Sequence, residues 1–329
     1  MSRTLALRLK HDLRSTTDLM ELVDVLKRVA VSQFHLLDKK RQSKGWTSAE
    51  VPAVGGQATD GRVSQESDGE LAIARAGDGG PALSLKAVLE DFFRLLQPQQ
   101  CQHPFLESPS PPLGIVIVTS DEGFLGGLNS AVIQKALAAR TGPQDELIVL
   151  GERGRMYLED LKEPFTHFAG AGEHMSDPEV ERLRDFLADR YLRRKVGKIM
   201  VWYPRPRSFT HQEVDSFQLL PYPRPSPRHD TVASNSEAVI LEPSAYLIIE
   251  YLVKLWVSRK IHDVFWQSKL SELAARATHL EASFQGLTQQ KKKLTLQYFR
   301  SRHEVTDTSI RESYAGMLGR KKEVAGRHE

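Results

Sequence analysis

Both ends of the chain carry apolar residues at alternating spacings of three and four, a pattern that is typical of long paired helices. Near the N-terminus no glycine or proline interrupts the chain before Gly45. A repeat that averages 3.5 residues keeps one stripe of a helix facing a second helix. At 1.5 Å per residue, this first helix is expected to be roughly 60 Å long. Its series is Leu5, Leu9, Asp12, Thr16, Leu19, Val23, Leu26, Ala30, Gln33 and Leu37.

The same spacing returns near the C-terminus, where Gly286 is the one interruption and costs up to about 1 kcal/mol in a helix. Because a helix as long as the first exceeds what most globular domains can cover, we expect the two series to pair with each other. The pairing is expected to be antiparallel, after the chain has returned through its middle. The C-terminal series is Leu270, Leu273, Ala277, Leu280, Phe284, Leu287, Lys291, Leu294 and Tyr298.

Between residues 113 and 203, short apolar runs alternate with amphipathic segments. Strands are expected at "GIVIVTS", "ELIVLG", "FTHFAG" and "KIMVWYP", with helices at 128–140, 153–161 and 178–194. Such alternation predicts a parallel, Rossmann-like sheet with helices on both faces. The proline-rich stretches "YPRPRS" and "YPRPSPRHD" that follow are expected to form a loop. The predicted fold class is therefore α/β, with a long antiparallel coiled coil of the terminal helices.

These elements divide the chain into four predicted parts. Residues 1–42 form the N-terminal coiled-coil helix, and residues 43–112 a flexible insertion, a short helix (Leu83 to Leu96) and a proline-rich linker. The insertion at 43–82 carries eight glycines and no sustained periodicity. Residues 113–235 form the Rossmann-like domain, and residues 236–329 the C-terminal helical region.

Composition excludes several classes of protein. A net charge of +3 and a pI near 8.8 are too mild to indicate nucleic-acid binding. The single cysteine, Cys101, excludes an internal disulfide and a cysteine-rich metal site, and the histidines show no ligand spacing. The longest apolar region contains Glu250 and Lys254 and is too short to span a bilayer. No metal or cofactor is expected, and the chain is expected to reach a membrane only through a partner.

The loop "TSDEGFLGGLNS" between the first strand and helix raises the question of a phosphate site. Gly123, Gly126 and Gly127 match neither the dinucleotide fingerprint nor the P-loop, because their spacing differs and no Lys-Ser/Thr pair follows. Asp121 and the neighbouring Glu122 would repel an anion at the helix N-terminus. We therefore interpret the loop as a fold element with a tight turn, in which Asn129 or Ser130 caps the helix. Nucleotide binding remains the alternative.

Six segments in order resemble the gamma subunit of F-type ATP synthases. "TSDEGFLGGLNS" is similar to the family's T-S-D-R-G-L-C-G-G-L-N-S motif, and "LKRVAVSQF" (26–34) to its K-M-V-A-A-S-K segment. "YPRPRSFTHQEV" with "QLLP" resembles the S-x-x-x-Q region after the last strand, and "ILEPSAYLI" the Y-x-x-E-P-S segment. "SELAARATHLEAS" and "LTLQYFRSRHEVT" resemble the two motifs of the C-terminal helix.

The chain also departs from the family pattern. Glu122 stands where the family usually has Arg, Leu125 where it often has Cys, and Phe299 and His303 where it has Asn and Gln. "TDTS" (306–309) replaces the family's T-x-E. With the glycine-rich insertion, these differences indicate a divergent member, such as one from a second-copy F-type ATPase that pumps ions.

The resemblance implies a central rotor shaft that couples ion-driven rotation of the c ring to conformational change at the catalytic beta subunits. It implies a non-catalytic subunit whose partners are three alpha and three beta subunits, the epsilon subunit and the c-subunit ring. As part of that membrane-bound complex, the chain would lie on the cytoplasmic face of a bacterial plasma membrane. Whether the ion is H⁺ or Na⁺ is decided in the c ring.

The matching motifs also imply contacts with the alpha and beta head. These are expected at Leu26, Lys27 and Arg28 on the first helix, and at Arg300, Arg302 and His303 on the last helix. The simpler interpretation of these residues is that they are exposed helix charges. Two other functions stay open, namely a nucleotide-binding α/β enzyme and a coiled-coil scaffold that has no rotary role.

Overall fold

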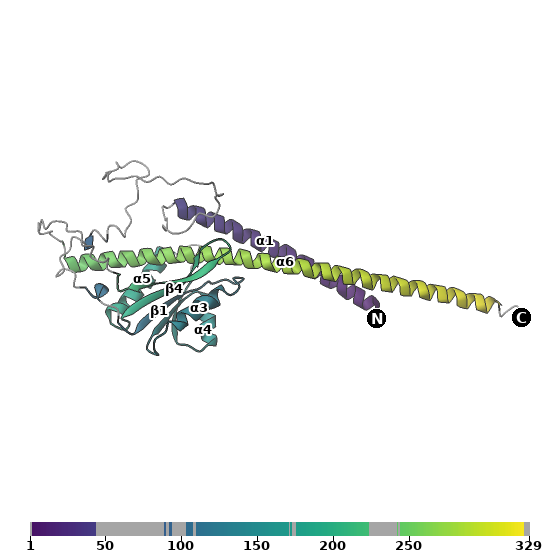
Figure 1. The fold of residues 1–329 in the computed structure, drawn as a ribbon, viewed down its shortest axis with the longest axis horizontal. Helices are drawn as coiled ribbons and strands as arrows, with labels where there is room; N and C mark the ends of the chain where they lie inside the picture. Colours follow the sequence, from purple (N-terminus) through teal and green to yellow (C-terminus); the bar gives the residue numbers. More distant parts are fainter. Residues whose placement is uncertain are drawn as a thin grey trace, which may run out of the picture. The chain divides into compact units, whose positions relative to one another are not determined.

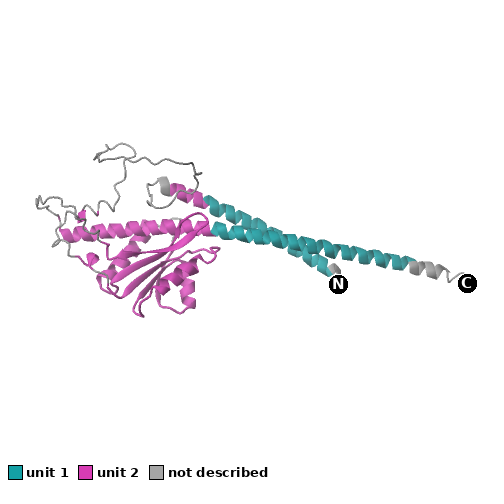
Figure 2. Cartoon of the chain, viewed as in Figure 1, with its two compact units in different colours: residues 1–32, 276–329 teal, residues 33–275 magenta. Residues whose placement is uncertain are grey.

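The structure is a computed structural model, and the residues that it describes are 2–43, 89, 92–93, 103–107, 110–170, 172, 176–223, 242 and 244–325. Apart from Ser43, the predicted insertion at 43–82 lies outside these residues. Of the predicted helix at 83–96, the described residues Leu89, Phe92 and Phe93 are helical. The chain divides into two compact units (Figure 2). Unit 1 is Met1–Ser32 with Arg276–Glu329, and unit 2 is Gln33–Ala275.

A five-stranded sheet forms the centre of unit 2, in the order β3-β2-β1-β4-β5 (Figure 1). β1, β2, β3 and β4 pair with one another in parallel, as the alternation of elements predicted. The predicted α/β fold class with its parallel sheet is therefore confirmed. The strands are β1 (Leu113–Val118), β2 (Glu146–Leu150), β3 (Phe165–Phe168), β4 (Lys198–Pro206) and β5 (Gln212–Leu220).

The fifth strand corrects the sequence prediction, because part of the expected proline-rich loop is a strand. β5 runs antiparallel to β4, and their pairing extends from Ile199 opposite Leu220 to Pro206 opposite Gln212. β4 pairs with β1 only as far as Trp202. Pro204 and Pro206 lie beyond that point, where β4 pairs with β5 alone among the described strands, and a proline without its N–H group is tolerated there.

Helices cover both faces of the sheet, again as predicted. On one face, Ile115, Ile117 and Val149 pack against α3 and α4. On the other face, Val116, Val118 and Ile148 belong to a core that includes α5 and the first part of α6, which lies along the sheet in Figure 1. The helices are α1 (Ser2–Ser43), the 3₁₀ turn η2 (Pro104–Leu106), α3 (Leu128–Ala138), α4 (Glu152–Asp160), α5 (Asp177–Leu192) and α6 (Ala245–Ala325).

The two terminal helices are as long as the 3–4 spacing predicted, with 42 residues in α1 and 81 in α6. The expected stripe of α6 is buried from Leu270 to Leu280 and half-buried from Phe284 to Tyr298. In unit 2, Phe34 and Leu37 of α1 pack with Leu270, Leu273 and Ala274 of α6. In unit 1, Lys27 of α1 contacts Glu281 of α6. As the residue number on α1 decreases, the residue number of the contacting residue on α6 increases. The two helices are therefore antiparallel.

Two positions of the expected α1 stripe are wrong. Leu5 and Leu19 are each 50% exposed, whereas Thr16 and Ala30 are buried. Met20 and Leu13 are half-buried instead. A stripe that repeats every 3.5 residues drifts around a helix with 3.6 residues per turn, so neighbouring positions exchange roles along its length.

Candidate functional site

The glycine-bearing loop after β1 uses its polar groups to hold the first turn of α4. Thr119 Oγ1 accepts a hydrogen bond from the Gly154 amide at 3.0 Å. The Ser120 carbonyl accepts one from the Arg153 amide at 3.0 Å, and Asp121 Oδ1 one from the Glu152 amide at 3.0 Å. The first amides of a helix have no partner within the helix and are the groups that bind anions. In α4, three of these amides are bound by the loop itself.

Asn129 joins the two ends of the same loop. Its Nδ2 donates to Ser120 Oγ at 2.8 Å, and its Oδ1 accepts from the Ser120 amide at 3.2 Å. The expectation that Asn129 or Ser130 caps α3 is wrong, because the N-cap residue is Gly127 and no side chain caps the helix. Asn129 lies inside the first turn, and its amide group is used by Ser120 rather than by the helix end.

Two glycines of the loop lie where a side chain would be unfavourable, each for a different local reason. Gly126 has a φ of +60°, a conformation that glycine adopts without strain. A Cβ at Gly123 would lie 2.7 Å from Arg153 Nη2, so a side chain there would displace the guanidinium group. Phe124 between them has a φ of +64° and is 62% exposed. Gly126 thus has a backbone reason and Gly123 a side-chain packing reason to be glycine, and neither reason involves a ligand.

Other candidate ligand sites are sparse in the part of the chain that the structure describes. A small cavity between the sheet and α6 is lined by apolar residues only, among them Val116, Leu187 and Phe265. Among the described residues, no group of three or more His, Cys, Asp or Glu side chains is placed to hold a metal ion. None of the described helices is long and apolar enough to cross a membrane.

The six residues expected to contact the head all lie in unit 1, but they form two groups. Leu26 is half-buried, and Arg28 is 77% exposed and pairs with Asp24 at 2.5 Å. Lys27 pairs with Glu281, which is 21 residues before Arg302 on α6. At 1.5 Å per residue, the two groups are roughly 30 Å apart along that helix.

The second group is fully on the surface. Arg300, Arg302 and His303 are all exposed on α6. The Arg302 carbonyl accepts a hydrogen bond from Thr306 Oγ1 at 3.0 Å, a contact within the helix backbone that leaves the guanidinium group outside it. These three side chains therefore present positive or titratable groups to solvent in the chain as described.

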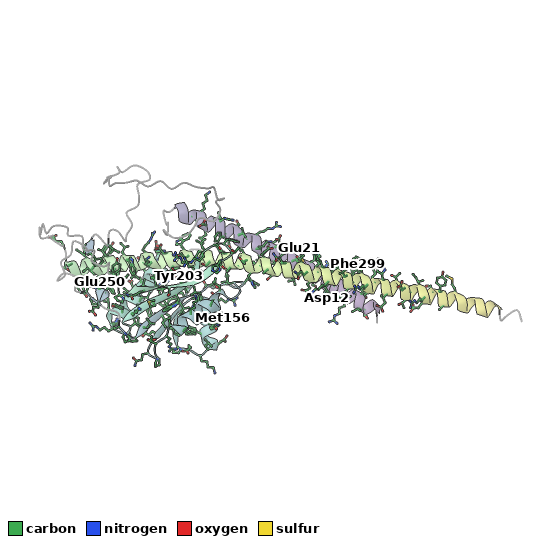
Figure 3. All side chains as sticks on the ribbon, viewed as in Figure 1. Asp12, Glu21, Met156, Tyr203, Glu250 and Phe299 are labelled. Atoms are coloured by element: carbon green, nitrogen blue, oxygen red, sulfur yellow. The ribbon has the colours of Figure 1, made fainter. Side chains whose placement is uncertain are left out.

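The sequence interpretation missed a set of apolar side chains on the outer surface of unit 1. Phe299, labelled in Figure 3, is 48% exposed on α6, and Leu22 on α1 is 54% exposed. Leu22 and Phe299 are apolar but fall between the positions of the 3–4 series, whereas Leu5 and Leu19 of the same exposed set belong to that series. The larger exposed apolar side chains of this unit are Leu5, Leu7, Leu19, Leu22, Val25, Val29, Leu296, Phe299, Ile310, Tyr314 and Met317.

Solved structures with a similar fold include chains from the rotor and the central stalk of mitochondrial ATP synthases. The rotor of the Euglena gracilis mitochondrial ATP synthase matches with a TM-score of 0.58 at 13% identity, over 92% of this chain and 99% of that one. The central stalk and c ring of the Tetrahymena thermophila enzyme include a chain that matches with a TM-score of 0.52 at 16% identity, over 80% and 99%. The fold that this chain shares with those two structures is therefore that of a rotor or central-stalk chain.

The sequence comparisons give the family. The model of the family described as "ATP synthase" matches residues 80–317, which is 238 of the 329 residues. The ATP synthase gamma chain of Clostridium novyi is 28% identical over 204 residues, 61% of this chain and 70% of that protein. The gamma chain of Desulfitobacterium hafniense is 28% identical over 228 residues, 68% and 79%. The chain belongs to the ATP synthase gamma-chain family, as the motifs predicted.

Proposed function

We propose that this chain is the central rotor shaft of an F-type ATP synthase or ATPase. The observation that carries the proposal is the family match over residues 80–317. The fold agrees with it, because its two long terminal helices and parallel sheet are those of rotor stalks. As a gamma chain it is a non-catalytic subunit, and ATP is made or hydrolysed on the beta subunits.

The partners of the shaft follow from the same family. They are three alpha and three beta subunits around the helices, the epsilon subunit, and the c-subunit ring that drives or is driven by rotation. The solved structures with a similar fold support the c ring, since they are of a rotor and of ATP synthase assemblies that contain a c ring. The complex is proposed to lie on the cytoplasmic face of the plasma membrane, with the c ring as the link to the lipid.

The glycine-bearing loop is proposed to be a fold element rather than a nucleotide site. The hydrogen bonds from the α4 amides to Thr119, Ser120 and Asp121 support this, because the polar groups of the loop are used to hold the first turn of α4. The test is calorimetric titration of the full chain with ATP. The absence of binding is expected, and binding at micromolar concentration would favour the α/β enzyme.

The first experiment is purification from native membranes with an affinity tag on this chain, followed by native mass spectrometry. One copy with three alpha and three beta subunits is the expected result. A homodimer that contains neither alpha nor beta would discard the rotary role and favour the scaffold.

Arg300, Arg302 and His303 are proposed to offer polar contacts to a loop of beta. The Arg302→Ala variant is expected to lower the ATPase rate of the assembled complex by about fivefold, since an arginine hot spot contributes more than 1 kcal/mol to an interface. Arg193→Ala, which removes an exposed arginine of unit 2, is the matched control. An unchanged turnover of the intact Arg302→Ala complex would contradict the assignment.

A further inference from the structure

Lys27 forms a junction between the two helices of unit 1. Its Nζ atom lies 3.0 Å from Asp24 Oδ1 on α1 and 3.0 Å from Glu281 Oε2 on α6. The same ammonium group lies 4.8 Å from the centre of the Phe284 ring, close enough for a cation–π interaction. Glu281 is held in turn by a hydrogen bond from Gln285 Nε2 at 2.9 Å. The ammonium group is thus oriented by three side chains, of which two are on the partner helix.

The charges of the junction reinforce one another. The hydrogen bond with Glu281, followed by that with Asp24, raises the pKa of Lys27. The hydrogen bond from Lys27 lowers the pKa of Glu281. The two directions agree, so the lysine is held charged and the carboxylate ionised. The Lys27 side chain is 22% exposed and that of Glu281 44%, and an ion pair this accessible stabilises a fold only weakly.

The position of the junction along the two helices indicates a role in setting their register, beyond its weak effect on stability. On one side of it lie small and tightly buried residues, with Ala30, Ala277 and Leu280 each at most 2% exposed. On the other side the α6 series includes Lys291, and Thr288 is half-buried beside it. The large apolar side chains described on α6 beyond Glu281 are half-buried or exposed. Close packing of large apolar groups therefore does little to fix the relative position of the helices in that second stretch. In coiled coils, a single polar or charged position is a known means of selecting one register over its neighbours.

We propose that the Lys27–Glu281 pair is a register pin that ties the two helices of the shaft together. Lys27 is then a positioning residue inside the shaft and not a contact with the catalytic subunits, which revises the expectation from the sequence. Slippage of α1 along α6 by one turn would separate the ammonium group from Glu281. The pin therefore maintains the register of α1 against α6 when a force acts on one of the two helices. The inference rests on the proposed function, because only a rotating shaft has to transmit torque through both helices.

Exchanging the charges of Lys27 and Glu281 tests whether Lys27 acts as the pin or as a contact with the alpha and beta head. The variants are Lys27→Glu, Glu281→Lys and the double variant, each incorporated into the complete ATPase complex. The readout is the number of ions pumped per ATP hydrolysed, which a residue that only stabilises the fold would not alter in an assembled complex. Since an exposed ion pair shifts an equilibrium by up to about fivefold, each single reversal is expected to lower this ratio by about twofold to fivefold. The double variant is expected to restore it.

Two control variants distinguish loss of the pin from a general effect of changing a charge on the shaft. Lys27→Arg keeps the charge and is expected to retain the pumping ratio. Lys10→Glu makes the same charge change at an exposed position of α1 and is expected to leave the ratio unchanged. A double variant as defective as Lys27→Glu alone would overturn the pin and make Lys27 a head contact again.

The pin can fail independently of the proposed function. Thermal unfolding of the full chain outside the complex reports the coupling between the two positions through a double-mutant cycle. A coupled pair in a chain that does not assemble with alpha and beta would keep the pin and discard the rotary role. Additive effects in a chain that does assemble would discard the pin alone.

Discussion

The two compact units of the chain use their apolar side chains differently. In unit 2, residues of the sheet form a closed core with α5 and the first part of α6. Leu187 of α5 is completely buried in this core. In unit 1, the buried apolar side chains among the described residues are those of Ala30, Ala277 and Leu280. Leu22 and Phe299 are exposed there. Unit 2 carries the core that determines its own fold, whereas unit 1 carries apolar surface that suits contact with partner subunits.

A pair of leucine truncations tests this difference at its largest. Leu187→Ala is expected to lower the free energy of unfolding by about 2–5 kcal/mol, because it leaves a cavity in a closed core. Leu22→Ala, at 54% exposure, is expected to change it by no more than about 0.5 kcal/mol. Urea unfolding of the full chain, followed by far-UV circular dichroism, which reports the helices of both units, measures both. Equal losses for the two variants would show that the units do not differ in this way.

The second test concerns a buried carboxylate of unit 2. Asp145 is 7% exposed, and its oxygens accept hydrogen bonds from the amides of Leu113, Thr141 and Gly142 at 2.7–3.0 Å. These bonds fix the loop between α3 and β2 to the start of β1. Removal of an acceptor that is charged and serves several donors is expected to cost about 1.5–3 kcal/mol in Asp145→Ala. Asp145→Asn, which keeps one carbonyl oxygen, is expected to lose less.

The same residue gives the expected pH dependence. Burial alone would raise the pKa of Asp145, but the hydrogen bonds from Leu113, Thr141 and Gly142 lower it overall. A carboxyl group whose pKa is lower in the folded state stabilises the fold above its unfolded pKa of about 4, and this contribution is lost as pH falls through the folded value. Acid titration of the wild type and Asp145→Asn should therefore converge at low pH. A constant difference between them down to the lowest pH would contradict this account.

The sequence predicted the elements whose pattern is local. α1 and α6 follow from the 3–4 spacing, and β1 and β2 from short apolar runs such as "IVIV". β5 was missed because Gln212–Leu220 mixes polar and apolar residues between prolines, and its pairing depends on β4 continuing through Pro204. Strand pairing of that kind is set by tertiary contacts rather than by propensity.

The candidate site was predicted less completely than the fold. The motifs located the residues of the loop and of the two helices, but not their partners. Lys27 lies 254 residues from Glu281, and no local pattern reports a contact across that separation. Asn129 is a residue type that often caps helices, yet its side-chain amide group bonds to Ser120. Only the folded turn brings the two residues within reach. The head contacts at Arg300, Arg302 and His303 stay a prediction.

The smallest expected effect is a gain in stability at the glycine that interrupts the α6 stripe. Gly286 is exposed and helical, and a Cβ added there would meet no atom within 4 Å. Gly286→Ala is expected to raise the free energy of unfolding by up to about 1 kcal/mol, since alanine is the better helix former. Thermal unfolding of the full chain by far-UV circular dichroism measures the gain.

Gly127→Ala is the matched control, because a Cβ there also has open space but the residue is the N-cap of α3. Alanine is disfavoured at an N-cap, so this variant is expected to be slightly less stable than the wild type. A loss of stability in Gly286→Ala would contradict the propensity argument. A more stable chain that turns more slowly in the assembled complex would show that a partner subunit uses the space beside Gly286, and the contrast between a self-contained unit 2 and a partner-facing unit 1 would then extend to a single methyl group.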